Sequence, residues 1–334
     1  MANLSIIKKS SVPFCIVILF LMVAQAVQAQ PDSLFLEPKY NTDKIPLTPV
    51  WLKENKAVLD FNEVAFVNWN SGGTNSISAL LGIQFARNYA LRHFTWNNTL
   101  RVRYGINAQE DQVLRKTDDH FEIISNVGYR ADTLTNWFYS ARFNFRTQLS
   151  NGYSYPDTSN PISRFMAPGY VFLGGGIEYG KNIEKLSLYF SPFTLKSTFV
   201  LDEKLANAGS FGVKPAVLDD DGNVLVPGEK TRLELGILLS GTHETPVMEN
   251  VVINNSVSLY TDYINNFGNI DVDWVLSAEF KVNQFIRASL GSHLKYDDDV
   301  KTFEPSPTDG EELVEKGAKV QWKQLLGVGV VVDF

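Results

Sequence analysis

Residues 137–150 read Trp-Phe-Tyr-Ser-Ala-Arg-Phe-Asn-Phe-Arg-Thr-Gln-Leu-Ser, and this stretch decides the fold. Starting at Trp137, every second side chain is apolar except Thr147, whereas the side chains between them are polar except Phe138. Alternation with a period of two predicts a β-strand with one apolar and one polar face, and a helix would scatter both sets around its axis. The run is more than twice as long as an ordinary strand of about five or six residues, so it can cross a membrane at a tilt.

The same alternation recurs along the chain, and we expect about twelve strands in all. They are expected at residues 57–69, 75–89, 94–108, 120–131, 137–150, 169–181, 186–201, 231–243, 251–263, 271–283, 286–298 and 320–334. The sixth and seventh of these segments alternate least regularly.

The connections between the expected strands alternate in length. Short connections are expected at 90–93, 132–136, 182–185, 244–250 and 284–285, and longer ones at 70–74, 109–119, 151–168, 202–231, 264–270 and 299–319. An even number of strands, with short turns at one end and long loops at the other, is typical of outer-membrane barrels. The sequence therefore predicts an all-β fold, a transmembrane antiparallel up-and-down β-barrel with both termini on the periplasmic side. A secreted β-sandwich is the alternative, but it requires neither strands of this length nor this rhythm of loops.

Residues 1–29 have the three parts of a secretory signal peptide. Lys8 and Lys9 supply positive charge, Val12–Ala24 is an apolar run, and Ala26–Ala29 offers small residues for cleavage. Cleavage is expected after the last of these alanines, with cleavage after the first, or an uncleaved anchor, as alternatives. The only cysteine lies inside the apolar run, so the mature chain has no disulfide or thiolate site.

The rest of the chain divides into two parts. Residues 30–56 contain four prolines among polar residues, and we expect them to form an extended periplasmic leader segment. Residues 57–334 are expected to form the barrel. The net charge of −7, without a basic tract, is unfavourable for nucleic-acid binding.

Aromatic residues collect at both ends of the expected strands, as they do where a barrel meets the two membrane interfaces. The expected girdles consist of Tyr89, Trp96, Tyr129 and Trp137 at the periplasmic ends and Tyr104, Trp274 and Trp322 at the outer ends. The chain ends on Phe334. A terminal aromatic residue on the last strand resembles the signal read by the barrel-assembly machinery, so that machinery and outer-membrane lipids are the expected partners.

Several short motifs occur in order along the expected barrel. They are Trp-Asn-Ser-Gly-Gly-Thr-Asn-Ser at 69–76, Phe-Arg-Thr-Gln at 145–148, Phe-Met-Ala-Pro at 165–168 and Tyr-Asp-Asp-Asp at 296–299, with further matches at 96–100, 115–119, 205–212 and 269–272. As a set they resemble a family of uncharacterised outer-membrane β-barrels of Bacteroides-type bacteria, known only as a domain of unknown function. The resemblance implies fold and location, and it supplies no reaction, ligand or catalytic residue.

Charged residues fall on the inward faces of many strands. The candidates for lining the lumen are Arg101, Arg103, Glu122, Arg142, Arg146, Glu279, Arg287, His293 and Lys295. Unpaired charges are costly in a closed interior, so these side chains must be paired or hydrated. One interpretation is a cross-braced, narrow or plugged lumen, and the other is a basic path for small anions.

No catalytic, cofactor or metal site follows from the sequence. Gln148–Gly152 is similar to the His-x-Ser-Asn-Gly stretch of outer-membrane phospholipases, but Gln148 stands where the general base is needed and cannot activate Ser150. Asp219–Asn223 resembles the start of a calcium loop, although its register fails and an Asp-Gly-Asn turn explains it. Asp297–Asp299 offers carboxylates for a divalent cation, but three adjacent acids on a strand alternate in direction.

The expected function is therefore that of a non-enzymatic outer-membrane barrel with a structural, assembly-partner or narrow transport role. A solute-conducting pore that prefers anions is the main alternative. A lipid-modifying enzyme and a barrel that binds ligands with its outer loops are further alternatives. Residues 30–56 are expected either to plug the barrel or to reach a periplasmic partner.

Overall fold

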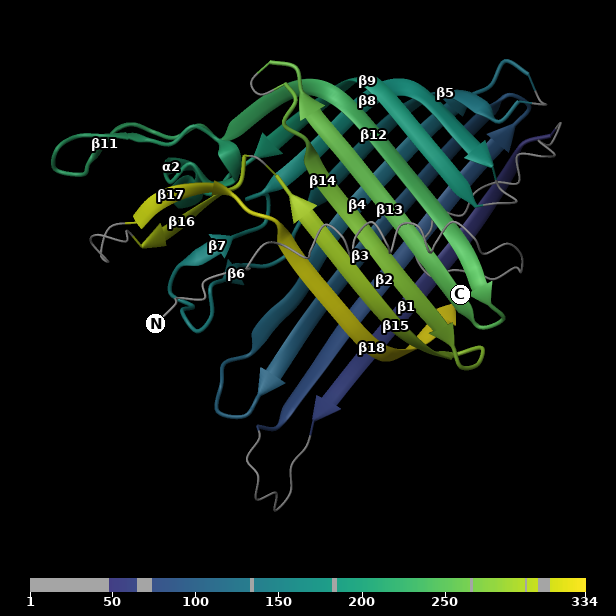
Figure 1. The fold of residues 1–334 in the computed structure, drawn as a ribbon, viewed down its shortest axis with the longest axis horizontal. Helices are drawn as coiled ribbons and strands as arrows, with labels where there is room; N and C mark the ends of the chain where they lie inside the picture. The colour runs from purple at the N-terminus through teal and green to yellow at the C-terminus, as the bar shows by residue number, and fades with distance from the viewer. Residues whose placement is uncertain are drawn as a thin grey trace, which may run out of the picture.

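The structure is a computed structural model that describes residues 48–64, 74–132, 135–181, 185–264, 267–297, 299–305 and 313–334. The expected signal peptide, most of the expected leader, residues 65–69 of the first expected strand and residues 70–73 of the first expected loop lie outside these residues. The described strands form one closed antiparallel barrel, which Figure 1 shows from the side.

Twelve strands make up the barrel wall. In chain order they are β1 (Val50–Val64), β2 (Ser76–Leu91), β3 (Phe94–Gln109), β4 (Arg115–Tyr129), β5 (Trp137–Thr147), β8 (Gly169–Lys181), β9 (Leu186–Phe199), β12 (Thr231–Met248), β13 (Val251–Asp262), β14 (Asp271–Lys281), β15 (Ile286–Tyr296) and β18 (Gln321–Asp333). The first and last strands close the wall, from the pair Lys56↔Asp333 to the pair Phe61↔Val328. Every wall strand therefore pairs on both edges, and the predicted antiparallel up-and-down barrel is confirmed, whereas the β-sandwich alternative is wrong.

The alternation of short and long connections is also present. The described short connections, such as Arg92–His93 between β2 and β3, lie at the end of the barrel where β1 begins and β18 stops. The long connections carry the small elements β6 (Gly152–Tyr153), β7 (Pro161–Ser163), α2 (Glu203–Asn207), η3 (Ser210–Gly212), β10 (Val217–Leu218), β11 (Val224–Val226), β16 (Lys301–Pro305) and β17 (Leu313–Ala318). In Figure 1 these elements gather at the end of the barrel away from the C-terminus.

The long loops have a small core of their own. Ala167, Val200, Ala206 and Val213 are buried together, with Phe211 packed against them. This cluster joins the loop before β8 to the loop between β9 and β12, so these two loops form one ordered cap. Among the residues that the structure describes, no helix is long and apolar enough to cross a membrane.

Three strand boundaries differ clearly from the sequence prediction. β12 ends at Met248 instead of residue 243, because it pairs with β13 as far as Met248↔Val251. β1 begins at Val50, directly after Pro49, so residues 50–56 of the expected leader belong to the wall. They do so because β2 is long enough to pair with all of them, from Val50↔Ala90 onward. β4 begins at Arg115 instead of His120, because pairing with β3 continues past a register shift at Gly105/Ile106.

Register shifts explain why the sixth and seventh expected strands alternate poorly. β8 and β9 slip between Gly175 and Ile177, and β12 slips against β9 between Gly236 and Leu238. Pro192 lies in β9 at this place and has no N–H to donate to a ladder, so a bulge is the conformation that accommodates it. A bulge inverts the phase of the alternation, and the polar and apolar positions exchange faces beyond it.

Aromatic side chains lie at the short-turn ends of β1 to β5, and their role as a membrane girdle stays a prediction. Trp96, Tyr129 and Trp137 are exposed there, and Tyr89 packs at 5.1 Å, measured between ring centroids, from Trp51. The sequence analysis missed Trp51 because it assigned this residue to the leader. At the other end Tyr104 and Trp322 are exposed. Trp274 is half-buried there, and its indole Nε1–H donates to Asn255 Oδ1 at 2.8 Å.

Candidate functional site

The barrel interior holds one large cavity of about 1020 Å³ among the described residues. Lys185 and Asp333 line it near the short-turn end, and Asp118 and Lys323 line it near the long-loop end, so the cavity extends along the barrel. The wall of this cavity includes all nine inward residues named from the sequence, Arg101, Arg103, Glu122, Arg142, Arg146, Glu279, Arg287, His293 and Lys295. The lumen is therefore the candidate functional site.

Many of these charges pair between adjacent or nearly adjacent strands. Arg101 Nη1 lies 3.2 Å from Glu122 Oε2 on the neighbouring strand β4. Arg287 Nη2 lies 3.4 Å from Asp60 Oδ2, two strands away, and Nη1 lies 3.8 Å from Glu279 Oε2. Such pairs keep the inward charges compensated and tie neighbouring strands together, which is the braced interior that the sequence analysis considered.

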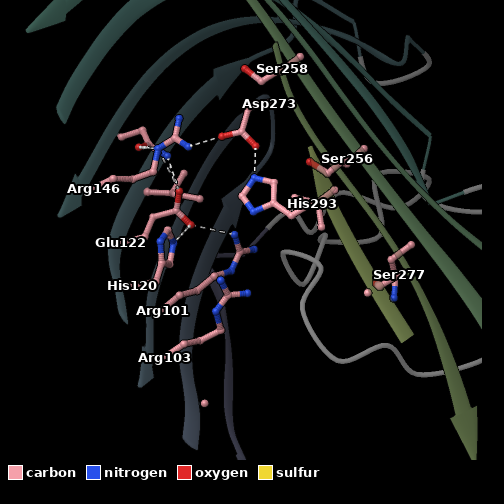
Figure 2. Close-up of a pocket in the computed structure, with 18 of the residues that line it drawn as sticks. Arg101, Arg103, His120, Glu122, Arg146, Ser256, Ser258, Asp273, Ser277 and His293 are labelled. Atoms are coloured by element: carbon pink, nitrogen blue, oxygen red, sulfur yellow. Dashed lines mark hydrogen bonds and ion pairs between the residues drawn. The ribbon is translucent and has the colours of Figure 1, made fainter. Parts of the chain in front are cut away.

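Among the described ion pairs, the one that crosses the lumen between the most widely separated strands joins β5 and β14. Arg146 Nη1 on β5 lies 3.0 Å from Asp273 Oδ2 on β14. The two strands are separated around the wall by β13, β12, β9 and β8 in one direction and by six strands in the other. Figure 2 shows this pair reaching across the cavity, with Glu122 beyond Arg146 and His293 beyond Asp273. We call Glu122, Arg146, Asp273 and His293 the transverse bridge.

Each end of the transverse bridge is anchored. Glu122 Oε1 accepts a hydrogen bond from Asn144 Nδ2 at 2.9 Å and lies 3.7 Å from Arg146 Nε. At the other end, His293 Nε2 lies 2.8 Å from Asp273 Oδ1. This is the only hydrogen bond that His293 makes within the described part of the chain, so no serine there completes a His–Asp pair into a hydrolytic triad. The side chains of Arg146 and Asp273 remain 27% and 23% exposed, so the bridge is wet.

A group of cations stacked on aromatic rings covers the wall on one side of the bridge. The guanidinium carbon of Arg142 lies 4.2 Å from the centroid of the Tyr189 ring, and that of Arg146 lies 5.2 Å from the Phe172 centroid. Tyr189 is buried with Leu238 and Tyr260. The sequence analysis missed these inward rings because they lie on the strands whose phase the register shifts invert.

A second ionic network lies on the same side, toward the long loops. Lys196 Nζ lies 2.9 Å from Asp271 Oδ2 and 3.4 Å from Glu234 Oε2. Arg232 Nη1 lies 2.8 Å from Asp299 Oδ1, which brings the start of the β15–β18 connection onto β12. Lys196 was not named from the sequence, and its place as the only charged residue of β9 is the signal that would have found it.

The phospholipase-like stretch makes no catalytic arrangement. Ser150 Oγ donates to Asp119 Oδ2 at 2.9 Å, and the backbone N–H groups of Leu149 and Ser150 also donate to this carboxylate. Lys116 Nζ lies 2.8 Å from the same oxygen. Asp119 therefore caps the turn after β5, and Ser150 serves that turn.

Replacing Asp119 with alanine should loosen this loop. The change removes four hydrogen bonds and leaves two backbone N–H groups without their acceptor, a loss of about 1 to 3 kcal/mol in local stability. We expect protease added to the folded protein to cut residues 148–164 faster than in the wild type. Asp157→Ala is the matched control because Asp157 bonds only to Ser159 in the described chain; equal cleavage of both variants would contradict the capping role.

Neither acidic loop segment forms a metal site in the described residues. No group of three or more His, Cys, Asp or Glu side chains is placed there to hold an ion. Asp219 accepts hydrogen bonds from the side chain and the backbone N–H of Asn223, and these lower the pKa of its carboxyl, as in a plain turn. Asp299 is paired with Arg232, and Asp298 lies outside the described residues.

Comparisons with known proteins leave the role of the chain open. Residues 61–153 match the model of a family described as "Protein of unknown function (DUF3078)". The predicted resemblance to a family of unknown function is therefore confirmed, while the bacterial group and the individual motifs stay predictions. No curated protein matches the chain.

Two solved structures are similar to this chain. The translocator domain of the autotransporter NalP from Neisseria meningitidis is 10% identical, with a TM-score of 0.32, over 85% of this chain and 88% of that chain. An outer membrane channel from Pseudomonas putida F1 is 11% identical, with a TM-score of 0.40, over 90% of this chain and 100% of that chain.

Proposed function

We propose that this chain is an integral barrel of the outer membrane that provides a narrow passage for small polar solutes and catalyses no reaction. The observation that carries the proposal is the cavity of about 1020 Å³, which extends between the two ends of the barrel and is lined by polar and charged side chains. A barrel of this strand number lies between small barrels filled by side chains and wide porins. The transverse bridge narrows the cavity without filling it, because its side chains stay partly exposed.

The charges on the cavity wall balance, which favours weak selectivity over a preference for anions. The described cations on the wall are Lys56, Arg101, Arg103, Arg142, Arg146, Lys185, Arg287, Lys295 and Lys323. The described anions on the wall are Glu54, Asp60, Asp118, Asp119, Glu122, Glu244, Asp273, Glu279 and Asp333. Nine positive charges thus face nine negative ones. The anion-path alternative depends on Arg142 and Arg146, and both are paired with carboxylates. Arg142 Nη2 lies 3.7 Å from Glu178 Oε2, and Arg146 Nη1 lies 3.0 Å from Asp273 Oδ2.

The proposed location implies three partners. The apolar exterior, on which Phe193 is 67% exposed and Leu326 is 64% exposed, suits outer-membrane lipids. Phe334 ends the chain beside β1, where its N–H donates to Asn55 O at 3.1 Å, and it suits the barrel-assembly machinery as a terminal aromatic residue. The residues before β1 remain free, in this proposal, to reach a periplasmic protein after the signal peptide is removed.

Single-channel recording tests the proposed passage. We expect the refolded mature protein to give small, stable conductance steps in a planar bilayer, with a reversal potential near zero in a salt gradient because the wall is balanced. A shift of the band on boiling before electrophoresis confirms that the barrel is folded. A folded but silent barrel would overturn the transport role and leave a structural one, and a strong anion preference would restore the anion-path alternative.

A further inference from the structure

Two cations lie opposite each other on the outer surface of the barrel. Lys53 on β1 pairs across the strands with Arg87 on β2. Glu54 and Lys56 line the cavity, so alternation turns Lys53 outward, and Gly82 on β2 places Arg87 on the outer face in the same way. Like charges directly opposite each other destabilise an antiparallel pair. A counter-charge would relieve this cost, and the chain itself does not supply it in the described residues, since neither side chain forms an ion pair there.

The guanidinium of Arg87 is held in place by the wall. Its Nη1 donates to Glu54 O at 3.2 Å and to Ala86 O at 2.6 Å, and its Nη2 donates to Asn55 Oδ1 at 2.8 Å. Arginine has five N–H donors, so the Nε–H and one Nη2–H have no partner within the described chain. The fixed group therefore keeps two donors for an anion outside the barrel.

The surroundings of the two cations are those of a membrane interface. Trp51 lies two residues nearer the short turns than Lys53, on the same face of β1. Its ring centroid is 5.1 Å from that of Tyr89 and 6.2 Å from that of Trp96. One row in the other direction, Asn55 Nδ2 donates to Phe334 O at 2.6 Å. Aromatic residues of this kind mark the level of lipid headgroups, where a charge on the outer wall of a barrel costs about 0 to 1 kcal/mol instead of several.

We propose that Lys53 and Arg87 bind the phosphate of a phospholipid in the periplasmic leaflet. The inference rests on the proposed location, with the short turns on the periplasmic side. A phosphate supplies the missing negative charge, accepts from the two remaining Arg87 donors and lets the lipid chains lie along the apolar wall beyond Asn55. The site would fix a lipid against the strand pair next to the β1–β18 closure.

The test measures lipid binding to the folded, full-length mature protein by native mass spectrometry. The probes are phosphatidylglycerol, which carries the phosphate, and diacylglycerol, which lacks it. We expect the double variant Lys53→Gln/Arg87→Gln to bind phosphatidylglycerol about tenfold more weakly than the wild type. Binding of diacylglycerol should not change. Lys204→Gln/Lys214→Gln is the matched control, because it removes two exposed lysines from the long loops at the other end.

Three results would overturn the site: unchanged binding of phosphatidylglycerol to the double variant, an equal loss in the loop control, or a parallel loss for diacylglycerol. The first result would leave an acidic protein surface as the ligand to pursue. Should the double variant fail to fold, Lys53→Gln alone, whose side chain is exposed, should still weaken binding severalfold. A conductance measurement separates the proposed lipid site from the proposed passage through the lumen. Both double variants should keep the single-channel conductance of the wild type, because neither changes a residue that lines the cavity.

Discussion

Arg146→Ala should raise the single-channel conductance about twofold or more, because it removes one partner of the ion pair that crosses the described lumen between the most widely separated strands, β5 and β14. Loss of the guanidinium also leaves Asp273 paired with His293 alone in the described chain. The wall would then carry one negative charge in excess, so the reversal potential should move toward cation selectivity. The free energy of unfolding of the barrel should fall by about 1 to 2 kcal/mol. This is less than for the loss of a fully buried ion pair, because both partners are partly exposed.

Arg103→Ala is the matched control for this prediction. Arg103 also lines the cavity, and its Nη2 lies 3.4 Å from Asp118 Oδ2 on the adjacent strand, so this pair does not cross the lumen. Both variants change the wall charge by the same amount, and only Arg146→Ala opens the bridge. Equal conductance of the two variants would mean that charge alone sets the current and that the bridge is not the constriction.

The sequence predicts much of the barrel because each wall strand has one apolar and one polar face, so that its residues alternate with a period of two. Residues 169–181 were expected as a strand and form β8 with these bounds. The inward position of Arg142 and Arg146 follows from the same alternation, since both lie on the face opposite to that of Ala141, Phe143 and Phe145. The sequence could not reveal which inward charges meet. Arg146 and Asp273 are far apart in the chain, and their contact depends on barrel diameter and strand tilt.

Local departures from regular alternation account for the other errors. Residues 53–56 are all polar, so they show no alternation and the sequence predicts that they belong to the leader segment. Their pairing with β2 nevertheless makes them part of the barrel wall. Tyr189 and Lys196 flank the register shift in β9, where the phase of the pattern reverses. These misread residues are also the ones that carry chemistry, since Lys53 lies in the proposed lipid site and Tyr189 supports Arg142 in the lumen.

The closure of the barrel should depend on the absence of a side chain at Gly329. A Cβ atom at this position in β18 would overlap the carboxylate of Asp60 and lie 2.7 Å from the carbonyl oxygen of Leu59. The strand β1 cannot retreat without breaking its register with β18, in which Asp60 faces Gly329. The Asp60 side chain cannot turn away freely either, because it pairs with Arg287 at 3.4 Å.

Gly329→Ala should therefore destabilise the barrel by about 3 kcal/mol or more, through overpacking combined with a disturbed inward ion pair. The measurement is the urea midpoint of the refolded protein in vesicles, read from the shift in electrophoretic mobility on boiling. Two glycines supply a graded control. A Cβ at Gly327 would lie 3.4 Å from Asp60 Cβ, and one at Gly175 would meet nothing within 4 Å. We expect the stability of the three alanine variants to fall in the order Gly175, Gly327, Gly329. Equal midpoints for the first and the last would show that β1 and β18 do not meet in this register, and the closed wall, on which the lumen and its bridge depend, would have to be redrawn.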